Sequence, residues 1–95
     1  MRRYELMLIV DGKLEEKDVP AAVDKHLDIV RERGGNVIKV DHWGKRRFVY
    51  EIRHMNEGFY AVVDFETTPE VLAELDRVLS LADEVVRFKV LRPVP

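Results

Sequence analysis

The sequence predicts an α+β fold in which two helices cover one face of a four-stranded antiparallel sheet. Apolar residues alternate with period two in residues 4–10, 37–43, 48–52, 59–66 and 84–91, which is typical of strands. They recur at three- and four-residue spacing in residues 19–30 and 69–82, which is typical of amphipathic helices. Strand, helix, long hairpin, helix, strand is the ferredoxin-like βαββαβ order, and right-handed crossovers place the first and third strands in the centre.

The first strand and helix occupy the N-terminal third of the chain. Tyr4 to Val10 form a strand that is apolar on both faces, and Asp11-Gly12 closes it. Asp18 is the predicted N-cap of the helix, and Gly34-Gly35 supplies its left-handed end. Five apolar residues share the core-facing side of this helix: Val19, Ala22, Val23, Leu27 and Val30.

A long hairpin follows the first helix. Val37 to Trp43 predict a strand that enters a basic bend, where Gly44 marks either a bulge or a corner. Strand character resumes from Phe48 to Ile52, and Met55 to Gly58 predict a turn. Phe59 to Glu66 then form the second strand of the hairpin. The sequence does not decide between the two roles of Gly44.

The second helix and the last strand complete the fold. Thr68 is the predicted N-cap, with Pro69 at the first helical position and an apolar stripe that continues to Ala82. Glu84 to Leu91 form the last strand, and Pro93 and Pro95 prevent further pairing. All 95 residues suit a single domain, 1–95, with one core.

Composition excludes several classes of function. The chain has no cysteine and therefore no disulfide or thiolate chemistry, which fits the reducing cytoplasm. No apolar run reaches ~18 residues, so we expect neither export nor a membrane span. A net charge of −2 is unusual for a nucleic-acid binder, so any RNA contact must depend on where the cations lie.

The residues give no sign of catalysis, metal or cofactor binding. His26, His42 and His54 lack the spacing that would bring two imidazoles onto one face of an element. The acidic residues of the first helix indicate a solvated surface. Gly34-Gly35 ends a helix and lacks the Lys-Ser/Thr of a phosphate-binding loop. We therefore expect no catalytic residue, no metal ligand and no cofactor.

Basic residues carry the strongest chemical signal. Nine of them are candidate RNA-binding residues: Arg2, Arg3, Lys45, Arg46, Arg47, Arg53, Arg87, Lys89 and Arg92. Four aromatic residues lie among them and could stack on unpaired bases: Tyr4, Trp43, Tyr50 and Tyr60. The alternative is that these cations are solvated and paired with nearby acids. The paired aromatic motifs of an RRM sheet are absent.

Strand periodicity also predicts a protein-binding face. Tyr4, Leu6, Leu8 and Val10, together with Ala61, Val63 and Phe65, are assigned to the helix side of the sheet. Met7, Ile9, Tyr60 and Val62 then remain exposed on two central strands as a predicted partner-binding patch. Glu5, Asp64 and Glu66 form its polar edge. The alternative is modest surface hydrophobicity without a partner.

The motifs together resemble one protein family. They are Arg2-Arg3-Tyr4-Glu5, Gly34-Gly35, Lys39-Val40-Asp41, Trp43-Gly44-Lys45-Arg46-Arg47, Tyr50-Glu51-Ile52, Gly58-x-Tyr60, Leu75-Asp76-Arg77 and Val86-Arg87-x-Lys89-Val90. In this order the chain is similar to bacterial small-subunit ribosomal protein six, and most similar to its actinobacterial branch. Phe88 departs from the family pattern, in which a smaller or more polar residue is common at this position. The sequence ends at Val94-Pro95 without an acidic extension, so we do not expect the tail modification that some relatives carry.

The resemblance implies a structural, non-enzymatic protein of the cytoplasmic small ribosomal subunit. It implies binding to the central domain of small-subunit ribosomal RNA as a heterodimer with small-subunit ribosomal protein eighteen. It also implies a monomer in isolation. Because members of this family are unusually acidic among ribosomal proteins, the net charge is no objection to this function.

The main alternative is a dimeric ferredoxin-like enzyme of the α+β barrel type, or a small-molecule regulatory module. Either would form homodimers, and the enzyme would need an apolar cavity between helices and sheet. An acylphosphatase-like enzyme is disfavoured, because the loop after the first strand carries Asp11, Glu15 and Glu16 where a phosphate would bind.

Overall fold

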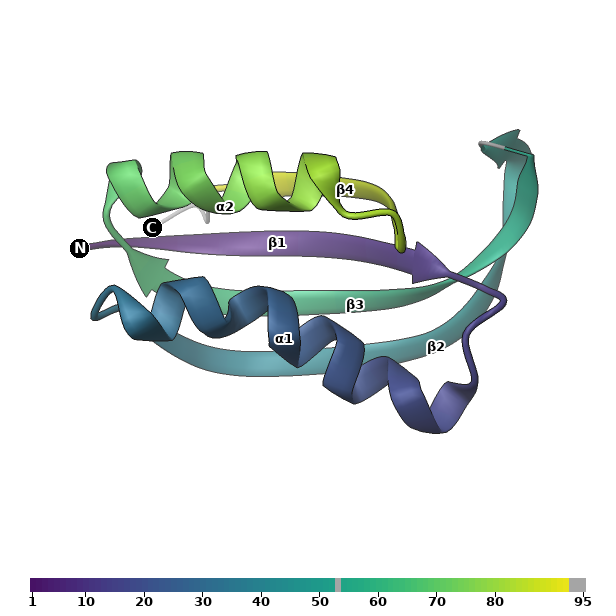
Figure 1. The fold of residues 1–95 in the computed structure, drawn as a ribbon, viewed down its shortest axis with the longest axis horizontal. Helices are drawn as coiled ribbons and strands as arrows, with labels where there is room; N and C mark the ends of the chain where they lie inside the picture. Colours follow the sequence, from purple (N-terminus) through teal and green to yellow (C-terminus); the bar gives the residue numbers. More distant parts are fainter. Residues whose placement is uncertain (53, 93–95) are drawn as a thin grey trace.

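A computed structural model describes residues 1–52 and 54–92 of the chain. Its elements in chain order are β1 (Arg2–Asp11), a 3-10 turn (Glu16–Asp18), α1 (Val19–Glu32), β2 (Asn36–Ile52), β3 (Met55–Thr67), α2 (Pro69–Leu81) and β4 (Val85–Leu91). The strands form one antiparallel sheet in the order β2-β3-β1-β4 (Figure 1). The predicted ferredoxin-like fold and the central position of the first and third strands are confirmed.

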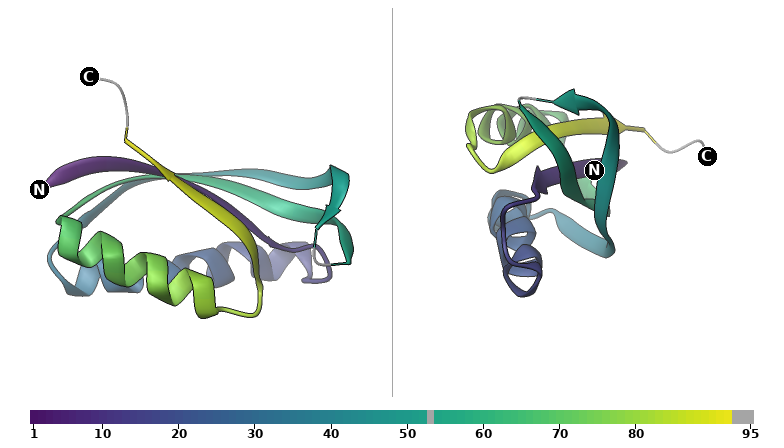
Figure 2. Two further views of the ribbon diagram at one scale, coloured as in Figure 1. Left: turned by 90° about the horizontal axis from the view of Figure 1, so that it is seen from above. Right: turned by 90° about the vertical axis from the view of Figure 1, so that its right-hand side faces the viewer.

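Both helices lie on the same face of the sheet (Figure 2). The register pairs Leu8 with Ala61 on β3 and with Phe88 on β4, so these residues share the helix side. Leu6, Leu8 and Phe65 are fully buried there against α1 and α2. The assignment of this set to the helix side is therefore confirmed, and the opposite face, here called the open face, has no helix over it.

The helix ends follow the sequence only in part. Thr68 Oγ1 accepts a hydrogen bond from the Val71 amide at 3.3 Å, as expected of an N-cap. Asp18 precedes α1 but makes no such bond, so its predicted capping role is wrong. The preceding 3-10 turn holds Asp18 at φ −92°, ψ −12°, instead of the extended conformation that capping needs. Gly34 ends α1 with φ +82°.

The hairpin is longer than predicted. β2 runs without a break through Gly44, whose φ of +84° accompanies a register shift between His42 and Gly44. Gly44 therefore belongs to a β-bulge, and Trp43 is the extra residue. Beyond the sheet the hairpin bends from the β2 side past β1 towards β4 (Figure 1).

The predicted turn at Met55 to Gly58 is wrong. Ile52 pairs with Met55, and His54 has the positive φ of +64° between them. Gly58 lies inside β3, where an added Cβ would come within 2.7 Å of Ile9 Cγ2 and 2.9 Å of Phe48 Cζ. Glycine is thus required at position 58 by close packing. The prediction that Pro93 and Pro95 prevent further strand pairing concerns positions outside the described residues.

Candidate binding surfaces

The four predicted partner-binding residues meet on the open face. Met7 lies opposite Val62, and Ile9 lies opposite Tyr60, in the β1–β3 register. On the other side of β1, Lys89 lies opposite Met7 and Arg87 lies opposite Ile9. The sheet therefore brings an apolar centre and two cations together from three strands.

A hollow of about 300 Å³ opens at this centre. This cavity, here called the open-face hollow, is lined by seven residues: Met7, Ile9, Ile52, Tyr60, Arg87, Phe88 and Lys89. Ile52 comes from the bent part of the hairpin, so a distant segment completes the wall. Phe48, also on the hairpin, packs edge-on against Tyr60 with 6.2 Å between the ring centroids.

The predicted exposure of Ile9 is wrong. Only 5% of Ile9 is accessible, whereas Met7, Tyr60 and Val62 are half-buried. Ile9 Cγ2 and Phe48 Cζ both approach the backbone of Gly58, so the hairpin covers this end of the open face. Ile9 therefore acts as the floor of the surface, and Met7, Tyr60 and Val62 are its accessible part.

Ion pairing separates the cations of the open face into two kinds. Arg3 Nε donates to Asp64 Oδ1 at 2.9 Å, and this hydrogen bond holds the pKa of Asp64 below its usual range. Within the described part of the chain, Arg87 and Lys89 have no ion-pair partner. An outside anion can therefore reach Arg87 and Lys89 without breaking an existing ion pair.

The nine candidate RNA-binding residues do not form one patch. Lys45, Arg46 and Arg47 lie opposite Phe59, Gly58 and Glu57, at the hairpin end of the sheet. A second group lies at the other end, where β1 begins and β4 ends: Arg2, Arg3 and Arg92. Arg87 and Lys89 lie between the two groups, on the open face. Arg53 lies outside the described residues.

The aromatic residues that were candidates for base stacking differ in how exposed they are. Tyr4 is buried, with its ring 5.8 Å from that of Phe65, so its predicted stacking role on RNA is wrong. The alternation that predicts β1 already places Tyr4 on the helix side. Tyr50 is 82% exposed on the hairpin, and Trp43 is 44% exposed at the bulge.

A partly buried polar contact between α1 and the segment before β4 was not predicted from the sequence. His26 Nε2 lies 2.7 Å from Glu84 Oε1, and Lys25 Nζ lies 3.1 Å from the same oxygen. The hydrogen bond from Lys25, together with that from His26, holds the pKa of Glu84 below its usual range. His26 falls on the apolar stripe of α1, which was the available signal that it is buried.

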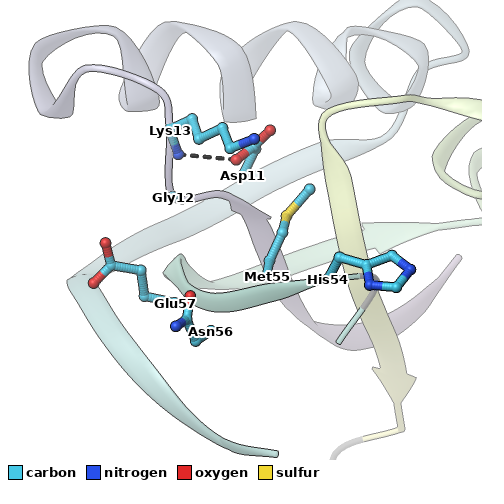
Figure 3. A pocket seen from close by; sticks show the side chains of 7 residues that line it. All are labelled: Asp11, Gly12, Lys13, His54, Met55, Asn56 and Glu57. Carbon is cyan, nitrogen blue, oxygen red and sulfur yellow. Dashed lines mark hydrogen bonds between the residues drawn. The ribbon is translucent and has the colours of Figure 1, made fainter. Parts of the chain in front are cut away.

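A second hollow, of about 150 Å³, lies between the end of β1 and the start of β3. Figure 3 shows its residues, with the His54 ring and the Glu57 carboxylate pointing to different sides. One Asp11 oxygen already accepts a hydrogen bond from the Lys13 amide at 2.8 Å.

Across residues 1–52 and 54–92, no group of three acidic, histidine or cysteine side chains is placed to hold a metal ion. None of the helices there is long and apolar enough to span a membrane.

The fold and its uncovered face define the class of protein: a small ferredoxin-like binding domain whose helices cover only one side of the sheet. A family model described as Ribosomal protein S6 matches residues 3–92. The chain belongs to the ribosomal protein S6 family. The predicted resemblance is therefore confirmed.

Individual relatives agree with this assignment. Small ribosomal subunit protein bS6 of Salinispora tropica is 50% identical over 93 residues, which cover 98% of this chain and 97% of the relative. The bS6 protein of Rhodococcus opacus is 53% identical over 92 residues, 97% of each chain. The crystal structure of 30S ribosomal protein S6 from Thermotoga maritima, 33% identical, matches with a TM-score of 0.88 over 97% of this chain and 87% of that one.

These relatives also establish the broad function. The family consists of structural proteins of the bacterial small ribosomal subunit, which works in the cytoplasm. The expectation of a structural protein is confirmed, and so is the expected similarity to actinobacterial members. The alternative of a dimeric barrel enzyme receives no support from these matches. The space such an enzyme would use, between helices and sheet, is filled by buried apolar side chains.

Proposed function

We propose that this chain binds the central domain of small-subunit ribosomal RNA as a heterodimer with small-subunit ribosomal protein eighteen. The observation that carries the proposal is the open face, where half-buried Met7 and Val62 lie beside the unpaired cations Arg87 and Lys89. An apolar centre with a polar edge is the usual anatomy of a protein interface. On this proposal, the chain is a monomer in isolation.

The two ligands would use different parts of the open face. The partner's apolar side chains contact Met7 and Val62 and enter the open-face hollow. The phosphates of the RNA contact the cations around it, chiefly Arg87, Lys89 and Arg46. Acidic residues outnumber basic ones in the helical segments, residues 13–35 and 68–84, while the rest of the chain is richer in cations. Repulsion between the helices and the RNA then turns the open face towards the polyanion.

Charged substitutions on the open face test the partner interface. We expect Met7→Glu and Val62→Glu each to abolish binding of purified ribosomal protein eighteen, because a carboxylate would be desolvated at an apolar contact. The thermal unfolding midpoint should stay nearly unchanged, because both side chains are only half-buried. Val49→Glu is the matched control, since Val49 is 91% exposed on the hairpin and does not line the open-face hollow.

Ile9→Glu distinguishes a binding residue from a packing residue. Because Ile9 is 5% exposed beneath the hairpin, this change should unfold the domain instead of selectively removing partner binding. Size-exclusion chromatography with and without the partner reports both complex formation and the oligomeric state of the free chain. Undiminished heterodimer formation by Met7→Glu and Val62→Glu, or a stable homodimer of the free chain, would contradict the proposal.

A further inference from the structure

Trp43 is held in place on the β2 edge of the open face although much of it is accessible. Its indole Nε1 donates a hydrogen bond to Asp41 Oδ2 at 3.2 Å. The Arg46 guanidinium carbon lies 5.7 Å from the ring centroid, within the range of a cation–π contact. Asp41 lies opposite Val62 and Arg46 lies opposite Gly58, so both anchors belong to the open face. The indole is thus oriented while 44% exposed.

The β-bulge explains why Trp43 can take this position. In regular pairing, Trp43 would lie opposite one residue of β3, but the register shift leaves it as the extra residue between His42 and Gly44. Gly44 permits the bulge through its φ of +84°, and an added Cβ there would meet nothing within 4 Å. Glycine at this position therefore serves the backbone conformation and not close packing.

We propose that Trp43 is a stacking platform for an unpaired base of the small-subunit RNA, with Arg46 contacting the adjoining phosphate. This inference rests on the proposed function, because it assigns one contact within that RNA interface. Bases splayed out of RNA helices stack on aromatic side chains, and a fixed ring loses little freedom when it does so. The guanidinium can cover the indole and still direct its in-plane N–H donors at a phosphate.

Charge decides in favour of RNA over a protein ligand at this cluster. Arg46 lies opposite Gly58 on the open face, whereas Lys45 and Arg47 lie opposite Phe59 and Glu57 and alternate to the other face of β2. Within the described residues, Arg46 has no ion-pair partner, and one Asp41 oxygen is occupied by the indole N–H. An aromatic surface beside an unpaired cation complements a polyanion that also carries flat rings.

The test uses the only tryptophan of the chain as its own probe. The full chain is produced with fluorine-labelled tryptophan and combined with unlabelled ribosomal protein eighteen and a central-domain RNA fragment. We expect the single fluorine resonance to shift when RNA joins the protein pair. Trp43→Leu should weaken RNA binding by about tenfold, whereas Trp43→Phe, which keeps an aromatic face, should retain most of the affinity.

Matched variants separate stacking from general effects. Ile38→Ala removes an apolar side chain of similar exposure, 47%, from the same strand, and it should leave RNA affinity unchanged. Gly44→Ala should weaken RNA binding by disturbing the bulge, and Gly44→Asn, which tolerates positive φ better, should restore part of it. Equal RNA affinity of the Trp43→Leu and wild-type chains would overturn the inference while leaving the proposed function standing.

Two further outcomes would count against a base-stacking role. A fluorine shift on adding ribosomal protein eighteen alone, with no further change when RNA is added, would place Trp43 in the protein interface and overturn the inference. Failure of the wild-type pair to retain the RNA at all would overturn the proposed function and, with it, this contact. Filter binding of the RNA, measured on the same samples, distinguishes these cases.

Discussion

At the scale of single residues, Glu84 connects two elements that are distant in sequence. Its carboxylate contacts Lys25 and His26 of α1, and its carbonyl accepts a hydrogen bond from the Asp11 amide at 2.8 Å. The first contacts join α1 to β4, and the last joins the end of β1 to the same residue. Glu84 therefore fixes the start of β4 against both the helix layer and the sheet.

Replacing Glu84 with glutamine should reduce the free energy of unfolding by about 1 kcal/mol near neutral pH, because the charged hydrogen bonds are removed from a partly buried site. The folded pKa of Glu84 is lowered, so this contribution is full above the ordinary carboxyl pKa and disappears as the pH falls through the folded value. Denaturant titrations of both chains should therefore converge in acid. Equal stability of both chains near neutral pH would refute this role.

Residue-level prediction succeeds where alternation decides and fails where packing decides. Alternation assigns Leu6, Leu8 and Phe65 correctly, because strand parity fixes which face each side chain occupies. It fails for Ile9, whose cover comes from Phe48, on a hairpin whose bend is not encoded in the local pattern. The predicted turn at Gly58 fails for the same reason, since glycine serves close packing and turns equally well.

At the scale of elements, the two helices begin differently. α2 begins at Thr68, which has the extended backbone and the side-chain bond of an N-cap. α1 begins after a 3-10 turn, and Asp18 contributes no capping bond. The sequence shows a capping residue at both places, so the difference arises from the backbone that leads into each helix.

Alanine substitutions at the two positions should measure this difference. Thr68→Ala should lower the free energy of unfolding by about 1 kcal/mol, because the Val71 amide loses its acceptor. Asp18→Ala should change it by less than ~0.5 kcal/mol, as expected of an exposed residue without a specific contact. Chemical denaturation of the two variants side by side provides the measurement. A larger loss at Asp18 than at Thr68 would contradict this account of the helix starts.

The hairpin shows how far element boundaries can be predicted. The sequence identifies both strands and the glycine at position 44 but leaves its role open between bulge and corner. The choice depends on whether β2 keeps pairing with β3 past His42, which it does through Arg47. Such pairing is a tertiary property, because β3 supplies the partners.

At the scale of the whole molecule, the order of elements is enough to predict the fold. Crossover handedness leaves few arrangements for two helices and four strands, and the observed sheet order is the expected one. The distribution of cations is harder to predict. The sequence places basic residues in clusters, but only the register shows that Arg87 and Lys89 meet the apolar patch while Arg2 and Arg3 lie at the far end.

The proposed RNA contacts should be visible in the salt dependence of binding. Each protein cation that neutralises a phosphate releases condensed counterions, so log affinity decreases as log salt concentration rises. The magnitude of this slope is smaller by about 0.7–0.9 for each phosphate contact that a variant loses. Changing Arg2, Arg46 and Arg87 together to glutamate should therefore weaken binding to the RNA–partner complex. It should also flatten that slope by about two to three.

Reversing Lys13, Lys17 and Arg33 to glutamate is the matched control for this triple variant. It changes the net charge of the chain equally but lies in segments outside the sheet, beside the acidic helix layer. If charge position governs binding, the control should lose affinity only through general repulsion and keep nearly the wild-type slope, since its cations engage no phosphate. Titrations at several salt concentrations would measure both slopes. An unchanged slope in the Arg2, Arg46 and Arg87 variant, or equal flattening in the control, would mean that net charge and not these cations governs RNA binding.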